Sequence, residues 1–183
     1  MTVPEIIIRV NADLLRWPTD DELEEDEPYF AGNQRYEDFR GFDWRDAIAA
    51  TRVDRHSMRS IGRGLVAEED LRDQLGGSTL EGPPWGLDIG VAGTVAALSA
   101  FGAIPAASCN GGRLGAHHSY SHPLVAFFAL PEMVQELIEY AEASGVGLTN
   151  SPNDDGTLLV FSPHLDALTT FARKLIRGRP QSK

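Results

Sequence analysis

The residue types best suited to chemistry stand in one short turn, Ser108-Cys109-Asn110-Gly111-Gly112, with Arg113 directly after it. Cys109 is the single cysteine of the chain, and the two glycines leave backbone N–H groups free to face an anion. The turn can therefore bind a ligand, and its thiol can act as a nucleophile if a base lies beside it. The competing interpretation is structural, because a lone cysteine is commonly a small buried hydrophobe and Asn-Gly is common in turns.

Histidines follow this turn in the next loop, at His117, His118 and His122. Under an enzymatic hypothesis Cys109, His117 and His118 are the catalytic candidates, with a histidine as the base that activates the thiol. His118 and His122 are four residues apart, a spacing that suits zinc only within a helix, and the residues between them do not favour a helix. We therefore expect neither a metal site nor a cofactor.

A second candidate is a stripe of arginines at Arg52, Arg55, Arg59 and Arg63. The spacing of three, four and four places them on one face of a helix predicted for Asp43–Gly62. Guanidinium groups bind phosphate and carboxylate bidentately, so the stripe could hold such an anion, and it is where we would expect any contact with nucleic acid. The competing interpretation is solvation, or pairing with acidic residues elsewhere in the chain.

The third candidate is the acidic and aromatic N-terminal part of the chain. Residues 1–50 contain 13 acidic and five basic residues, which is most of the imbalance behind a net charge of −11. Seven acids fall within eight positions: Asp20, Asp21, Glu22, Glu24, Glu25, Asp26 and Glu27. Aromatic residues dominate interface hot spots, so these acids with Tyr29 and Phe30 predict a docking surface for a basic protein. Alternatively the acids only confer solubility and the aromatics close over a core.

Composition bounds the remaining possibilities. The chain has 183 residues with 42% hydrophobic and 23% charged residues, which is typical of an ordinary globular protein. No apolar run reaches the length of a membrane span, no secretory signal begins the chain, and one cysteine suits a reducing compartment. We therefore expect a cytoplasmic protein without membrane contact. Residues 1–82 and 83–183 are expected as two segments, or together as one compact domain.

The elements that must position these residues follow a regular order. A short strand is expected within Glu5–Val10, and a second short helix within Ala67–Leu75. From Asp88, which is expected to cap a central helix ending at Phe101, the pattern predicts the order α-β-β-α-β-β-α. That order favours an α/β (α+β) two-layer sandwich, with helices on one face of a mainly antiparallel sheet and an irregular or helical N-terminal segment.

Around Cys109 the sequence resembles the wybutosine-synthesising tRNA methyltransferase family over about residues 87–162. The matching residues are Asp88, Val91, Val95, Leu98 and the motif Ser108-Cys109-Asn110-Gly111. The resemblance implies a fold of that kind and, more weakly, binding of S-adenosylmethionine and tRNA. The chain departs from the family pattern at Asn110, where a small hydroxyl residue is usual, and at Gly112, which separates the motif from Arg113.

Two functions follow as hypotheses. The first is a protein-binding module of inhibitor, immunity or regulatory type, which engages a basic partner through the acidic, aromatic surface. The alternative is a nucleotide- or RNA-modifying enzyme that uses the Ser108–Gly112 turn and the nearby histidines.

Overall fold

The computed structural model of the protein describes residues 4–24, 38–65, 82–112, 120–153 and 155–179. Within these residues the strands are β1 (Ile8–Arg9), β2 (Ile104–Asn110), β3 (Pro123–Phe128), β4 (Gly147–Asn150) and β5 (Leu158–Phe161). The helices are α1 (Trp44–Gly62), α3 (Ala92–Phe101), α4 (Val134–Ser144) and α5 (Leu165–Gly178), with short 3-10 turns at η1 (Ala12–Leu14), η2 (Asp21–Leu23) and η4 (Pro131–Met133).

The strands form one open, mixed sheet in the order β1-β4-β5-β3-β2. β1 lies parallel to β4, with Ile8 opposite Leu148, whereas β4–β5, β5–β3 and β3–β2 are antiparallel pairs. β3 is buried along its whole length, as its nearly continuous apolar sequence predicts for a central strand. β1 and β2 are the two edges of the sheet.

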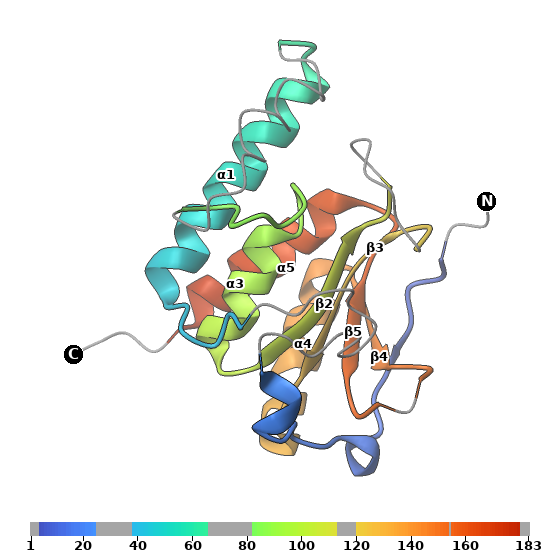
Figure 1. The fold of residues 1–183 in the computed structure, drawn as a ribbon. Helices are drawn as coiled ribbons and strands as arrows, with labels where there is room; N and C mark the ends of the chain where they lie inside the picture. The colour runs from blue at the N-terminus through green and yellow to red at the C-terminus, as the bar shows by residue number, and fades with distance from the viewer. Residues whose placement is uncertain (1–3, 25–37, 66–81, 113–119, 154, 180–183) are drawn as a thin grey trace.

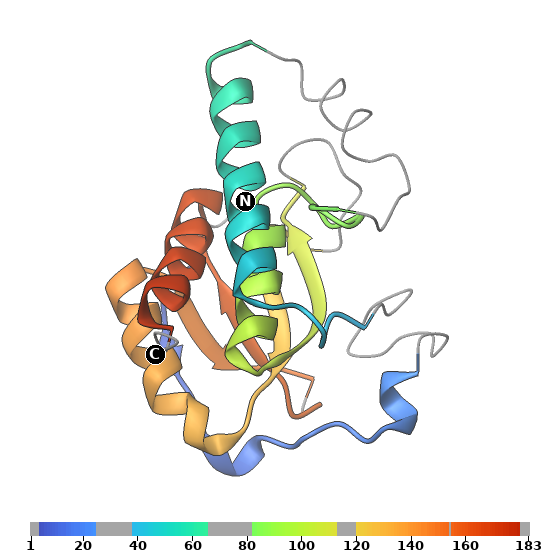
Figure 2. The ribbon, with the colours of Figure 1, turned by 90° about the vertical axis from the view of Figure 1, so that its left-hand side faces the viewer.

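The helices form a layer on one face of this sheet (Figure 1). α3 packs against β2 and β3, α5 packs beside α3 and against β3, and α4 packs beside α5 over β4 and β1. α1 contacts mainly α3 and α5 and so lies outside α3, as Figure 2 shows with α1 in front of α3. Its last turns project beyond the other helices in both views.

α3 lies at the centre of this packing, and its small residues are what allow it. Every residue from Ala92 to Ser99 is buried, because α1 covers one side of the helix and the sheet covers the other. At Gly93 a Cβ would lie 2.8 Å from the Cα of Thr51, so only glycine permits α1 to approach this closely. The Thr94 hydroxyl donates to the Leu168 carbonyl at 3.2 Å and links α3 to α5.

The fold class and the order of elements predicted after residue 88 are confirmed: α3, β2, β3, α4, β4, β5 and α5 follow one another as expected. The predicted helix at Asp43–Gly62 and its Asp43 cap are confirmed as well. The short helix expected within residues 67–75 lies outside the described residues. No helix in the described part of the chain is both long enough and apolar enough to cross a membrane.

The expected cap of the central helix is wrong. α3 begins at Ala92, and its N-cap residue Val91 makes no side-chain cap bond. The acceptor comes instead from α1: Asp54 accepts hydrogen bonds from the Gly90 and Gly93 amides, each at 2.7 Å. Asp88 is engaged elsewhere, since its Oδ2 accepts from the Asn110 amide at 3.3 Å.

The N-terminal segment is tied to both edges of the sheet. At one edge β1 pairs with β4, and the Asn150 side chain bonds the backbone of Asn11. At the other, Leu23 from η2 packs against Ile104, Ala106 and Phe128, on the face away from the helices. The first residues of the chain therefore share the core of the later ones.

Candidate functional site

The Ser108–Gly112 turn is shorter than predicted: Ser108, Cys109 and Asn110 belong to β2 and pair with β3, so only the two glycines form the turn at the end of the strand. Cys109 stands opposite Leu124 of β3 and is 3% exposed, so the thiol belongs to the packed interior. The chain then turns at Gly111 and Gly112, both of which have a positive φ. A Cβ at Gly111 would lie 2.5 Å from the His122 backbone, so the turn closes tightly over the start of β3.

The surroundings of Cys109 do not activate it. Burial raises the pKa of the thiol above its ordinary value, although the Gly111 amide, which donates to Sγ at 3.2 Å, acts in the opposite direction. A protonated, buried thiol is a poor nucleophile. Asn110 is also buried, and its Oδ1 has no hydrogen-bond partner among the described residues.

The histidines expected to assist Cys109 are mostly beyond the described chain, since Arg113, His117 and His118 lie outside it. His122 is described: burial lowers its pKa, and its ring contacts that of Phe161 with the centroids 5.6 Å apart. No hydrogen bond joins it to Cys109 in the described parts of the chain. In those same parts, no three His, Cys, Asp or Glu side chains gather closely enough to hold a metal ion.

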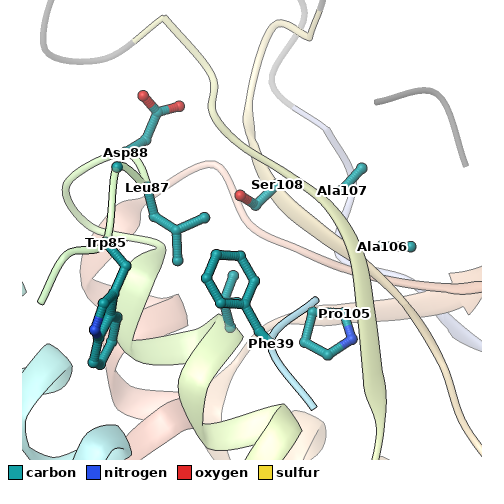
Figure 3. Close-up of a pocket in the computed structure, with 10 residues that line it drawn as sticks. Phe39, Trp85, Leu87, Asp88, Pro105, Ala106, Ala107 and Ser108 are labelled. Atoms are coloured by element: carbon teal, nitrogen blue, oxygen red, sulfur yellow. The ribbon is translucent and has the colours of Figure 1, made fainter. Parts of the chain in front are cut away.

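A cavity of about 260 Å³ lies beside this turn, between β2 and the loop that leads into α3. Its lining includes the side chains of Phe39, Trp85 and Leu87, and Phe39 lies across from the β2 residues around Pro105 (Figure 3). Asp88 and Ser108 supply the polar groups of the lining. We assign this cavity no ligand.

The aromatic residues next to this cavity are part of the core. Phe42 packs on Trp85 with ring centroids 4.2 Å apart and on Phe39 at 5.0 Å. The Ser99 hydroxyl donates to the Phe39 carbonyl and fixes this segment on α3. Of the aromatics around the acidic segment, these two therefore close over the interior, together with Trp44.

The acidic segment is only partly described. Glu25, Asp26, Glu27, Tyr29 and Phe30 lie outside the described residues. Glu22 is committed to an internal contact: it accepts from both terminal nitrogens of Arg16 at 2.7 Å, and this bond holds its pKa at about 2. Asp20, Asp21 and Glu24 are exposed.

Large apolar side chains are exposed in the same region. Four of the six exposed large hydrophobic residues in the described chain belong to its first 24 residues. These four are Ile6, Ile7, Leu14 and Trp17. Leu14 is 52% exposed and Trp17 42%, so the N-terminal segment combines exposed carboxylates with exposed apolar side chains.

The arginine stripe is divided by the tertiary structure. Arg55 and Arg59 line a groove of about 580 Å³ between α1 and α5, whereas Arg52 and Arg63 are exposed on α1 and do not line it. Arg173, from α5, lines the opposite wall. Arg173 was not among the predicted site residues, although Arg173 and Arg177 have the same four-residue spacing as Arg55 and Arg59.

Comparisons with known proteins found no match: no protein-family model, curated protein or solved structure matches the sequence. The resemblance to the wybutosine-synthesising tRNA methyltransferase family therefore stays a prediction.

Proposed function

We propose that this protein is a cytoplasmic, non-enzymatic binding protein of inhibitor, immunity or regulatory type that engages another protein through its N-terminal segment. The proposal rests on one observation. The segment from Glu5 to Glu24 holds most of the exposed large hydrophobic side chains of the described chain, and exposed acids stand among them.

The surface chemistry defines the partner. Asp13, Asp20, Asp21 and Glu24 are exposed, and a basic surface would meet them with complementary charge. Trp17 supplies a large, amphipathic side chain of the kind that anchors interfaces. The partner is therefore a basic protein with an apolar pocket that accepts Trp17 or Leu14.

The enzymatic alternative receives less support. It requires an accessible thiolate at Cys109, and the observed thiol is buried with a raised pKa. Binding of S-adenosylmethionine and tRNA is implied only by the family resemblance around the Ser108–Gly111 motif.

The test is native mass spectrometry of the tagged full chain, purified gently from its own cells, in wild-type form and as Asp20→Lys/Asp21→Lys/Glu24→Lys. We expect the wild type to retain a partner protein in stoichiometric amount. Charge reversal should weaken that complex about tenfold or more, because it places like charges against a basic surface. Trp17→Ala should weaken it to a similar degree.

A matched control reverses three exposed acids, one on η4 and two on α4, as Glu132→Lys/Glu139→Lys/Glu142→Lys. This variant changes the net charge equally and should keep the partner. If both triple variants lose the partner equally, the effect comes from overall charge and not from the N-terminal segment. A wild-type chain that retains no partner protein would contradict the proposal. If the wild type retains a small molecule that the Cys109→Ser variant does not retain, the enzymatic alternative is favoured.

A further inference from the structure

A groove between α1 and α5 gathers arginine side chains from two helices that are distant in sequence. Arg55 and Arg59 lie one turn apart on α1, and Arg173 and Arg177 lie one turn apart on α5. Arg55, Arg59 and Arg173 line the groove, whose volume is about 580 Å³. The two helices pack against each other along this line.

The four guanidinium groups act on one another. Burial lowers the pKa of Arg173, and the positive charges of Arg55, Arg177 and Arg59 lower it further. The free protein thus holds several like charges close together, and their mutual repulsion is unfavourable. An anion bound in the groove would attract all of these arginines and so offset their mutual repulsion.

The described chain supplies no such anion. Its ion pairs, Arg16–Glu22 and Arg40–Asp38, both lie elsewhere. Asp166 lines the same groove, but no ion pair of 4.0 Å or less joins it to an arginine in the described residues. None of these four arginines therefore forms an ion pair with an acid of the described residues.

The rest of the lining narrows the class of ligand. The start of α5 lies in the groove, and its N-cap residue His164 makes no side-chain cap bond, so the positive end of the helix dipole adds to the arginine field. Met58 and Leu165 provide an apolar part of the wall. Several guanidinium groups exceed what one carboxylate needs and match phosphate groups, which carry more charge and more acceptor oxygens.

We propose that this groove binds a small molecule carrying a diphosphate or triphosphate group. Arg55, Arg59 and Arg173 donate to the phosphate oxygens, and Arg177 adds charge from the next turn of α5. The apolar wall at Met58 and Leu165 is the place for a base or another organic group, when the ligand has one.

The test is calorimetric titration of the full chain at low ionic strength with three probes: inorganic pyrophosphate, ADP and citrate. We expect pyrophosphate and ADP to bind and citrate to bind at least about tenfold more weakly. Arg55→Gln/Arg173→Gln should weaken pyrophosphate binding about tenfold or more, because each lost arginine removes charge-assisted hydrogen bonds. The proposal is supported whichever of pyrophosphate and ADP binds more tightly. Tighter binding of ADP would indicate a ligand with an organic group, and tighter binding of pyrophosphate would indicate an inorganic one.

The control variant is Arg52→Gln/Arg63→Gln, which removes one exposed arginine of α1 and the arginine directly after that helix, neither of which lines the groove. It should weaken pyrophosphate binding clearly less than the groove variant does, because neither side chain is placed to donate to a phosphate in the groove. Circular dichroism should show that the groove variant folds, and at low salt it should unfold at the same or a higher temperature because two mutually repelling charges are gone. Absence of pyrophosphate binding by the wild type, equal weakening by both double variants, or equal binding of citrate would each overturn the proposal.

Discussion

At the scale of single residues, Asp54 is the most consequential side chain in the described structure. Its side chain is 1% exposed and accepts hydrogen bonds from the Gly90 and Gly93 amides at the start of α3. These two bonds link α1 to the central helix. Burial raises the pKa of this carboxyl to about 6, against the lowering effect of the Gly90 and Gly93 amides. A group with a raised pKa makes folding depend on pH.

This linkage gives a testable pH dependence. Between about pH 4 and pH 6 the folded protein keeps a proton on Asp54 that the unfolded chain releases, so unfolding releases a proton. The free energy of unfolding should therefore fall by about 3 kcal/mol as the pH rises through this window and then level off. Urea denaturation measured from pH 4 to pH 7 would show the slope.

Asp54→Asn removes the titrating group and should flatten that slope. It should also lower stability at every pH, because the Gly90 and Gly93 amides donate to different oxygens of Asp54 and asparagine would place an NH2 group, a donor, at one of these positions. Asp21→Asn, at an exposed site, is the matched control and should keep the wild-type slope. An unchanged slope in Asp54→Asn would exclude Asp54 as its source.

At the scale of elements, α1 owes its start to a reciprocal pair of caps. The Asp43 side chain accepts from the Arg45 and Asp46 amides, and Asp46 Oδ2 accepts from the Asp43 amide at 2.9 Å. Because α1 supplies both Asp54 and the arginines Arg55 and Arg59, its start fixes the positions of these side chains along the helix.

Asp43→Ala should lower the free energy of unfolding by about 1 kcal/mol, which is typical of a lost N-cap. Chemical denaturation measures the loss, and hydrogen exchange should become faster in the first turn of α1. The control is Glu142→Ala on the exposed side of α4, with an expected change below about 0.5 kcal/mol. Equal losses in the two variants would show that the capping box contributes nothing specific.

At the scale of the whole molecule, the N-terminal segment is both part of the core and a candidate interface. Leu23 is 4% exposed within the small cluster on the outer face of the sheet, and Arg16 places its guanidinium over the Phe128 ring at 5.4 Å. Leu14, nearby in sequence, is 52% exposed. The acidic segment and the arginine groove belong to different elements, so the two proposed sites can be tested separately.

Leu23→Ala should lower the free energy of unfolding by about 2 kcal/mol or more, since it removes a buried side chain and leaves a cavity. Leu14→Ala should leave stability within about 0.5 kcal/mol of the wild type and weaken only the proposed complex. Thermal and urea denaturation distinguish the two. A stable Leu23→Ala variant would mean that η2 contributes little to the fold.

The sequence alone determined the elements that depend on near neighbours. Apolar periodicity, the Asp43 cap and the stop at Gly145 act within a few residues, and they predicted the order of helices and strands after residue 88 together with the fold class. Periodicity also located the arginines on one face of α1.

Only the tertiary structure decided which distant groups meet. Nothing local to Asp54 indicates that it caps α3, and nothing local to Arg173 indicates that it faces Arg55. Each depends on how closely α1, α3 and α5 pack, which is set by small residues such as Gly93 and by the shared apolar core. The burial of Cys109 has the same origin, because a strand end is packed or open according to what the rest of the chain places against it.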